Sequence, residues 1–266
     1  YLVFAGANER HDWDYLTKLA PKDGSVQLQK ITTQMGVLVL AGPKSREVLQ
    51  KLTDTDLSND KFKWLTGKPI NVGYAQAEAL RVNFVGELGW ELHHPIEMQN
   101  YIFDELMKAG AEFDIKPFGI RAMDSMRLEK SYRLIPREMS IEYAALESGL
   151  DRFVKLDKEC DFVGKTALLD WQKRGFVNSF VTLEVHDVED ADARGSEGLY
   201  KDGELVGRAT SGGFGFRVNK SLALGLVQVA YGVEGTELEI EILGKRRRAT
   251  VISESAFDPD NAALRS

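Results

Sequence analysis

The stretch of greatest chemical interest is VNFVGELGWELHH, residues 82–94, which places Glu87 between Gly86 and Gly89 in the turn of an expected hairpin. A carboxylate accepts two adjacent N–H donors side by side, as from a guanidinium, and the 2-amino-4-oxo edge of a pterin offers such a pair. The glycines would let a flat ring approach the backbone, and Trp90 would give it an apolar wall. On spacing alone, a turn with a solvated glutamate is the commoner meaning of this pattern, so both interpretations stay open.

A second concentration of polar groups lies in GIRAMDSMRLEKSYRLIPRE, residues 119–138, where four arginines gather: Arg121, Arg127, Arg133 and Arg137. Guanidinium groups are suited to a ligand tail that carries several carboxylates. Some of these arginines must pair along the helix, since Glu129 and Arg133 are four residues apart. For any single arginine, a solvated helix face is the simpler interpretation.

Residues 1–175 are expected to form a mixed α and β domain. Apolar runs predict strands at 1–5, 26–31 and 36–42 and a hairpin over 78–94; amphipathic periodicity predicts helices at 10–20, 43–52, 96–110 and 119–134. In the helix at 43–52, Val48, Leu49 and Leu52 share one face. In the helix at 96–110, we expect Ile102, Phe103 and Leu106 to pack inward.

Residues 176–266 form a different pattern, with short apolar runs separated by turns. Lys201–Glu204 and the pair Gly244 and Lys245 supply tight turns. Four or more antiparallel strands at this spacing predict a small barrel or sandwich. The expected fold class is therefore α+β, with a C-terminal antiparallel β-barrel domain.

The composition argues against several function classes. With 34 Lys and Arg against 41 Asp and Glu, the net charge is -7, which disfavours nucleic acid and anionic membrane as partners. No apolar run is long enough to span a bilayer, and the single cysteine, Cys160, fits a reducing compartment such as the cytoplasm, or the mitochondrial matrix in a eukaryote.

His93 and His94 would point to opposite faces of a strand, so no metal site is expected. No G-x-G-x-x-G follows a strand, so no dinucleotide site is expected within the chain.

Taken in order, several motifs resemble those of the aminomethyltransferase family, which has the glycine-cleavage T-protein fold and binds tetrahydrofolate. They are GVLVLAGPKSREVLQKL, VNFVGELGWEL, GIRAMDSMRLEKSYRL, ESGLDRFVKLDKECDFVGKTAL and GELVGRATSGGFGFRVNKSLALGLV. The similarity covers essentially the whole chain, and RLEKSYRL and SREVL look closest to the C-terminal folate-binding region of dimethylglycine and sarcosine dehydrogenases.

The resemblance implies that Glu87 grips the pterin ring, and that Arg127 and Glu129 support the ligand or the structure. Two features depart from the family pattern. Met123 stands where the family has a folate-facing arginine, so Arg121 is the possible substitute. The segment with the family's catalytic aspartate would precede Tyr1, so no catalytic residue is assigned.

The implied function is tetrahydrofolate-dependent one-carbon transfer, coupled to the oxidation of an N-methylated amine by an FAD domain or flavoprotein subunit outside this segment. A stand-alone aminomethyltransferase-like protein and a non-catalytic folate-binding module are the alternatives. A purely structural or interaction domain is a third.

Overall fold

The computed structural model describes residues 1–266, and its first sheet has four antiparallel strands in the order β1-β4-β3-β2. The strands are β1 (Met35–Ala41), β2 (Gly67–Val72), β3 (Ala75–Leu80) and β4 (Gly89–Pro95). β3 and β4 pair through Glu78 and His93, Ala79 and Leu92, and Leu80 and Glu91, so the expected hairpin is confirmed. β1 pairs only with β4 and is an edge strand.

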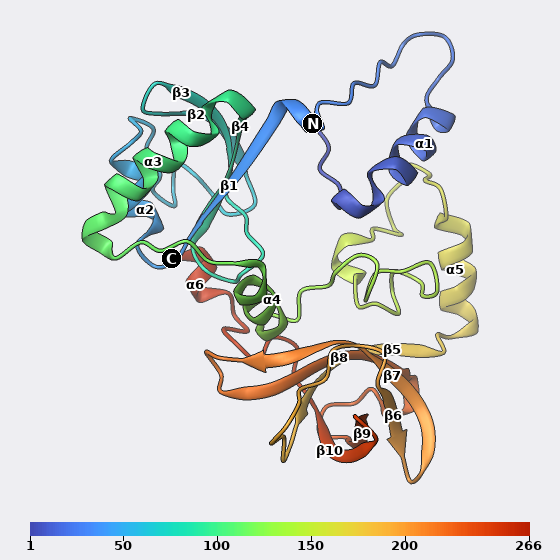
Figure 1. Ribbon diagram of the computed structural model, residues 1–266. Coiled ribbons are helices and arrows are strands. Elements are labelled where there is room, and N and C mark those ends of the chain that lie inside the picture. The colour runs from blue at the N-terminus through green and yellow to red at the C-terminus, as the bar shows by residue number, and fades with distance from the viewer.

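Two helices cover one face of this sheet, α2 (Ser45–Gln50) and α3 (Gln99–Gly110) (Figure 1). Their side chains join a core of buried residues centred on Trp90, which includes Val48, Leu49, Ile102 and Leu106. Leu52 packs against this core from outside. The inward packing expected for Phe103 is wrong: 40% of the residue is exposed, because it lies beside the free edge of β1 rather than over the sheet.

Two expected strands near the N-terminus are also wrong. Tyr1–Ala5 and residues 26–31 belong to no sheet. A strand is stabilised by hydrogen bonds to a neighbouring strand, and apolar composition alone does not supply that neighbour. The helix expected between them forms as α1 (Glu9–Leu19), but none of its residues is buried.

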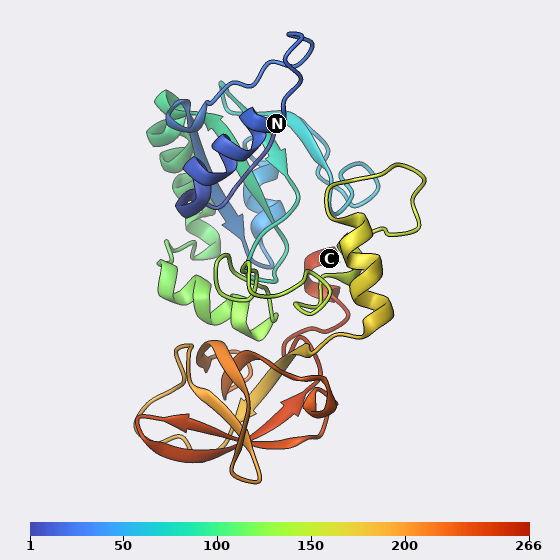
Figure 2. The same ribbon diagram turned by 90° about the vertical axis from the view of Figure 1, so that its right-hand side faces the viewer.

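The two halves of the chain are joined by a long connection with little regular structure. It contains α4 (Ile120–Glu129) and α5 (Lys165–Arg174), and a short C-terminal helix, α6 (Ala262–Arg265), returns to the first half (Figure 2). Short 3-10 turns occur at Gly6–Asn8, Thr32–Gln34, Ile96–Met98, Ala111–Phe113, Asp151–Phe153 and Val229–Tyr231. Every helix is too short or too polar to cross a membrane.

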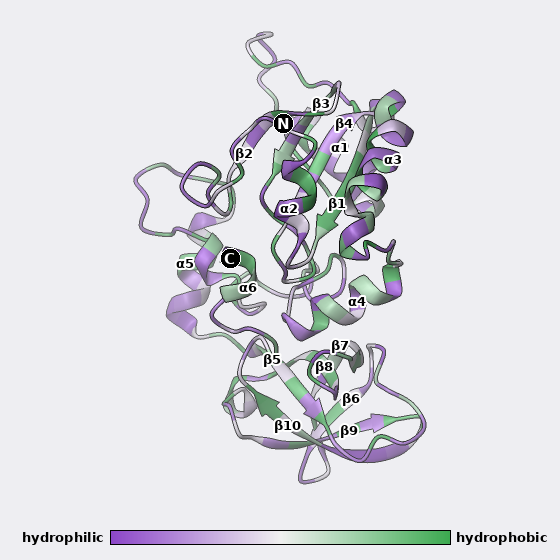
Figure 3. Ribbon diagram, turned by 90° about the vertical axis from the view of Figure 1, so that its left-hand side faces the viewer, coloured by the Kyte–Doolittle hydropathy of each residue, from purple (hydrophilic) through white to green (hydrophobic).

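The C-terminal half is a closed antiparallel barrel with strand order β10-β5-β8-β7-β6-β9, as expected from its turns. Its strands are β5 (Asn178–Val185), β6 (Gly198–Lys201), β7 (Glu204–Gly215), β8 (Lys220–Gln228), β9 (Glu237–Ile242) and β10 (Lys245–Ile252). The two residues between β6 and β7, Asp202 and Gly203, both have positive φ, as a type I′ turn requires. Closure leaves the barrel without a free strand edge. Figure 3 shows the barrel and the first sheet as separate bodies with α4 at the junction.

Two leucines of the barrel allow a matched test of its core. Leu183 is fully buried in β5, so Leu183→Ala should lower the free energy of unfolding by about 2–5 kcal/mol through lost burial and a residual cavity. Leu205 in β7 is 60% exposed, and Leu205→Ala should change stability by no more than about 0.5 kcal/mol. Urea unfolding of both variants measures the difference, and equal effects would contradict the assigned barrel interior.

Candidate functional site

The loop between β3 and β4, residues 81–88, is organised by the side chain of Asn83. Its Oδ1 accepts hydrogen bonds from the backbone N–H groups of Val85 and Gly86, both at 3.0 Å, and its Nδ2 donates to the carbonyl of Glu87 at 2.6 Å. Gly86 has φ +76°. A Cβ at that position would lie 2.4 Å from Cγ of Lys130, so the space beside Gly86 is filled by this chain's own lysine.

Glu87 lies in this loop with 18% of its side chain exposed. Its Oε1 accepts a hydrogen bond from Nη1 of Arg217 at 2.8 Å, and Arg217 lies in the turn between β7 and β8 of the barrel. The carboxylate therefore pairs with a guanidinium group of this chain, a partner that was not predicted from the sequence. The second oxygen, Oε2, forms no hydrogen bond with the protein.

Arg217 also ties the barrel to the end of α4. Its Nε donates to the carboxylate of Glu129, its backbone N–H donates to Glu129 Oε1 at 2.6 Å, and its Nη2 donates to the carbonyl of Met126 at 2.9 Å. The guanidinium carbon lies 3.9 Å from the ring centre of Phe257, a cation–π contact. Glu129 is 1% exposed and has no cationic side chain other than Arg217 within ion-pair distance.

Lys130 is the second cation of this region, and it is 1% exposed. Its Nζ donates to the carbonyls of Phe257 and Asp258, at 3.1 and 2.6 Å, and to Asn261 Oδ1 at 3.0 Å. Burial lowers the pKa of Lys130 below its ordinary value, which the charge of Asp258 partly offsets. We call the set of Glu87, Glu129, Lys130, Arg217 and Phe257 the junction cluster.

The other three residues expected at the ligand site lie elsewhere. Trp90 is fully buried, packs edge to face against Phe62 at 6.1 Å, and lines neither of the two large cavities. Arg127 is fully buried and donates to Asp124 Oδ1 at 2.7 Å and Ser211 Oγ at 2.8 Å. Arg121 is exposed and forms no ion pair. The structure thus separates Trp90 and Arg121 from the junction cluster, and the ligand contacts of these residues and of Glu87 stay predictions.

A large cavity lies on the face of the first sheet that α2 and α3 leave open. It has a volume of about 570 Å³ and lies between the N-terminal segment, α1, residues 27–32 and the strands β1 and β4. Most of its lining is apolar, with Trp13 and Leu16 from α1 and Met35 and Val37 from the β1 strand; His93 of β4 adds a polar group.

Glu91 lies two residues before His93 on the same face of β4 and contacts this cavity-lining histidine. Register places Glu91 between Val39 of β1 and Leu80 of β3. Its side chain is 25% exposed, its Oε2 is 3.1 Å from His93 Nε2, and its Oε1 has no hydrogen-bond partner. No cationic Lys or Arg side chain lies within ion-pair distance of Glu91, in contrast to Glu87.

The sequence contained a signal for Glu91 that was missed. Alternation along β4 puts Trp90 and Leu92 in the core, so Glu91 and His93 must face the other side. His94, on the core side, contacts Gln99 and the carbonyl of Leu92, so the two neighbouring histidines have separate environments.

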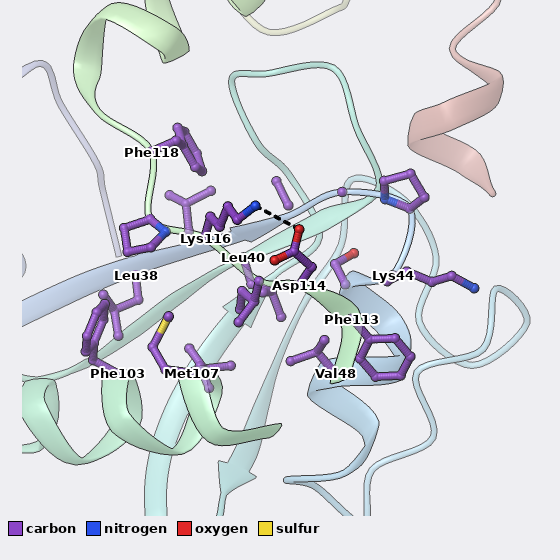
Figure 4. Close-up of a pocket in the computed structure, with 18 of the residues that line it drawn as sticks. Leu38, Leu40, Lys44, Val48, Phe103, Met107, Phe113, Asp114, Lys116 and Phe118 are labelled. Carbon is purple, nitrogen blue, oxygen red and sulfur yellow. Dashed lines mark hydrogen bonds and ion pairs between the residues drawn. The ribbon is translucent and has the colours of Figure 1, made fainter. Parts of the chain in front are cut away.

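A second cavity, of about 540 Å³, follows the free edge of β1 (Figure 4). Its lining is mainly apolar, with Leu38, Phe103, Met107 and Phe118 among the labelled residues. Its charged groups include Asp114 and Lys116, which pair with each other at 2.8 Å. Val37 lines this cavity and the larger one, so the two meet at the edge strand.

The fold agrees with comparisons to known proteins. The GCVT N-terminal domain matches residues 1–158, and the glycine cleavage T-protein C-terminal barrel domain matches residues 178–258. The chain belongs to the glycine cleavage T-protein family, a family of folate-binding aminomethyltransferases with homologues among demethylating dehydrogenases. The resemblance and the fold class expected from the sequence are confirmed.

Relatives of two kinds are similar to this chain. Mitochondrial dimethylglycine dehydrogenase of Homo sapiens is 41% identical over 95% of this chain, which spans only 29% of that protein. An aminomethyltransferase of Thermoanaerobacter sp. (strain X514) is 32% identical over 97% of this chain and 68% of the relative. The crystal structure of glycine cleavage system aminomethyltransferase T from Bartonella henselae superimposes with a TM-score of 0.79 at 25% identity, covering 95% of this chain and 67% of that one.

The junction cluster makes Arg217 a test of how the two halves are held. Arg217→Met leaves the buried carboxylate of Glu129 without a cation and should lower the free energy of unfolding by about 3–5 kcal/mol. Arg208→Met removes an exposed pair with Glu142 and should cost no more than about 1 kcal/mol. Urea unfolding compares the two variants, and equal losses would show that the Arg217 pair is no stronger than a surface one.

Lys130 gives the junction a defined pH dependence. Between its lowered pKa and the ordinary value of 10.5, the unfolded chain binds more protons than the folded protein, so stability gains as pH rises through this window. The stability difference between the wild type and Lys130→Met should therefore shift in favour of the wild type toward pH 10. Chemical denaturation from pH 7 to pH 10 measures it, with Lys173→Met, an exposed lysine, as the control that shows no such shift.

Proposed function

We propose that this chain binds a reduced folate and serves tetrahydrofolate-dependent one-carbon transfer, as the folate-binding part of a dehydrogenase that demethylates an N-methyl amine. Its membership of a folate-binding family supports the ligand class. The higher identity to dimethylglycine dehydrogenase than to the aminomethyltransferases supports the demethylating context.

The open-face cavity fits a folate in size and in chemistry. Its volume of about 570 Å³ lies within the usual range for small-molecule sites, and its lining combines apolar walls with polar groups that include Glu9, Lys30 and His93. Glu91 adds a carboxylate whose Oε1 is unpaired, next to Val39 and Leu80. A carboxylate flanked by apolar side chains suits the paired N–H donors of a pterin edge.

Two carboxylates of one motif are candidates for this contact, and the structure distinguishes their surroundings. Glu87, the residue expected from the sequence, is paired with Arg217, so a pterin would compete with a guanidinium for its oxygens. Glu91 has no Lys or Arg to displace and lies 3.1 Å from His93, which lines the cavity. We therefore propose Glu91 as the pterin-binding carboxylate, and the single observation that carries this is its position on the open sheet face without a Lys or Arg partner.

The remaining residues would bind and shield the ligand. When bound, tetrahydrofolate supplies the nitrogen that accepts the one-carbon unit. The apolar lining of the cavity would exclude water from a hydrolysable electrophile, and Glu91 would orient the ring. Arg121, exposed and unpaired, is available to a carboxylate tail, whereas the hydrogen bonds of Arg127 are made within the protein.

Oxidation of the amine is assigned to a flavin domain outside this segment. The chain matches less than a third of the dehydrogenases, which leaves room in such proteins for another catalytic unit. A stand-alone aminomethyltransferase is the second candidate, because the bacterial aminomethyltransferases match over about two thirds of their length. Oxidation of an N-methyl amine by the protein that contains this chain would favour the first candidate, the folate-binding part of a dehydrogenase.

Titration with 5-formyltetrahydrofolate, a stable reduced folate, tests the proposed site. Removing a charged double hydrogen bond should cost about 1.5–3 kcal/mol of binding free energy, so Glu91→Gln should bind about 10–150 times more weakly than the wild type. Glu78→Gln, which alters an exposed carboxylate of the neighbouring strand, should bind as the wild type does.

Glu87→Gln separates the two assignments. We expect it to reduce stability more than affinity, because its partner is Arg217. Loss of affinity in Glu87→Gln and none in Glu91→Gln would return the pterin contact to Glu87 and refute the open-face site. No measurable binding by the folded wild type would refute folate binding itself.

A further inference from the structure

His93 is almost completely buried, yet it belongs to neither the hydrophobic core nor the junction cluster. It is 1% exposed, and it lies on the open face of the first sheet, where it lines the 570 Å³ cavity. Register places it between Val37 of β1 and Glu78 of β3. A buried imidazole on a ligand-facing surface needs an explanation beyond packing.

Both ring nitrogens of His93 are engaged. Nε2 lies 3.1 Å from Glu91 Oε2, and Nδ1 lies 2.9 Å from the hydroxyl of Tyr1. The Tyr1 ring meets the imidazole edge to face, with ring centres 5.5 Å apart at 89°. The three side chains form a continuous hydrogen-bonded row from the cavity wall to the carboxylate.

Chemistry fixes the direction of this row. An ionised carboxylate only accepts, so Nε2 of His93 must carry the proton that it donates to Glu91. In the neutral ring, Nδ1 is then an acceptor, and the Tyr1 hydroxyl donates to it. Burial and the charge of Glu91 raise the pKa of Tyr1, which keeps this hydroxyl protonated as the donor.

We propose that His93 is a positioning residue for ligand binding: it holds Glu91 through Oε2, with its own tautomer and ring orientation fixed by Tyr1, so that the carboxylate faces the pterin edge. Oε1 and the second lone pair of Oε2 then accept the two N–H donors of that edge. This inference rests on the proposed function. A carboxylate on a flexible side chain loses rotamer freedom when it binds, and a hydrogen bond that fixes it beforehand reduces that loss. His93 itself would not touch the folate.

Two substitutions of His93 separate the hydrogen bond from the volume of the ring. In His93→Gln the amide nitrogen takes the place of Nε2 and can still donate to Glu91, whereas His93→Leu keeps an apolar side chain of similar size and donates nothing. We expect His93→Leu to weaken 5-formyltetrahydrofolate binding about 5–10-fold, because Glu91 must then be ordered when the ligand binds, and His93→Gln to stay within about twofold of the wild type.

The double variant Glu91→Gln/His93→Leu tests whether His93 acts through Glu91. If it does, the double variant binds no more weakly than Glu91→Gln alone, since the effects of residues in one row are not additive. Additive losses would show a separate effect of the imidazole and overturn the proposal. Equal losses of affinity in His93→Gln and His93→Leu would also overturn it, because the change in side-chain shape alone would then explain the loss.

The outcomes distinguish this inference from the proposed function. Normal binding by His93→Leu together with loss in Glu91→Gln refutes the positioning role and leaves the folate site intact. A folded wild type that does not bind 5-formyltetrahydrofolate refutes both. Nitrogen-15 NMR of the histidine rings provides a readout independent of affinity: His93 should be the Nε2–H tautomer in the wild type, and a protonated Nδ1 in the neutral ring would refute the assigned row.

Discussion

The arrangement of the two halves depends on one buried ion pair, between Arg217 and Glu129. Glu129 ends α4 with 1% of its side chain exposed, and a carboxylate in that position is costly unless a cation neutralises it. The turn between β7 and β8 supplies that cation, and the backbone N–H of Arg217 adds a second hydrogen bond. This ion pair thereby links the barrel to the helix, and Glu87 joins it from the first sheet.

The C-terminal segment completes the same junction through its backbone. Lys130 donates to the carbonyls of Phe257 and Asp258, and Arg81, which is 2% exposed, donates to the carbonyls of Phe62 and Leu264. Neither cation has an acidic side chain within ion-pair distance. Hydrogen bonds to carbonyl oxygens stabilise the buried charges of Lys130 and Arg81. The segment after β10 therefore stabilises the first half, although it follows the barrel in sequence.

Local patterns were sufficient for much of the fold. The apolar run at residues 36–42 forms β1, and the predicted turn at Lys201–Glu204 joins β6 to β7, so both follow from neighbours in sequence. The apolar run Tyr1–Ala5 shows the limit of such patterns, since a strand also requires a partner. Phe103 shows a second limit of local patterns. Helical periodicity predicts which residues share a face of the helix, but not which part of the protein that face contacts.

The candidate site was harder to predict because its determinants are far apart in sequence. Arg217 is the partner of Glu87 across 130 positions, and no local feature of either segment indicates the pair. When that partner is not known, a glutamate between two glycines is as consistent with a ligand-binding site as with a turn. The glycines themselves serve packing: a Cβ on Gly86 would meet Lys130, and one on Gly89 would lie 2.4 Å from the carbonyl oxygen of Leu40.

Glu87 and Glu91, four residues apart, illustrate how the same side chain acquires different chemistry from its surroundings. A guanidinium already occupies one oxygen of Glu87, so a ligand that uses both oxygens must compete with that ion pair, which reduces the net gain. Glu91 has the imidazole of His93 as its only hydrogen-bond partner and keeps one oxygen unpaired beside Val39 and Leu80. In such surroundings a new pair of N–H donors replaces water rather than a protein cation, which is the condition under which a buried carboxylate contributes most to affinity.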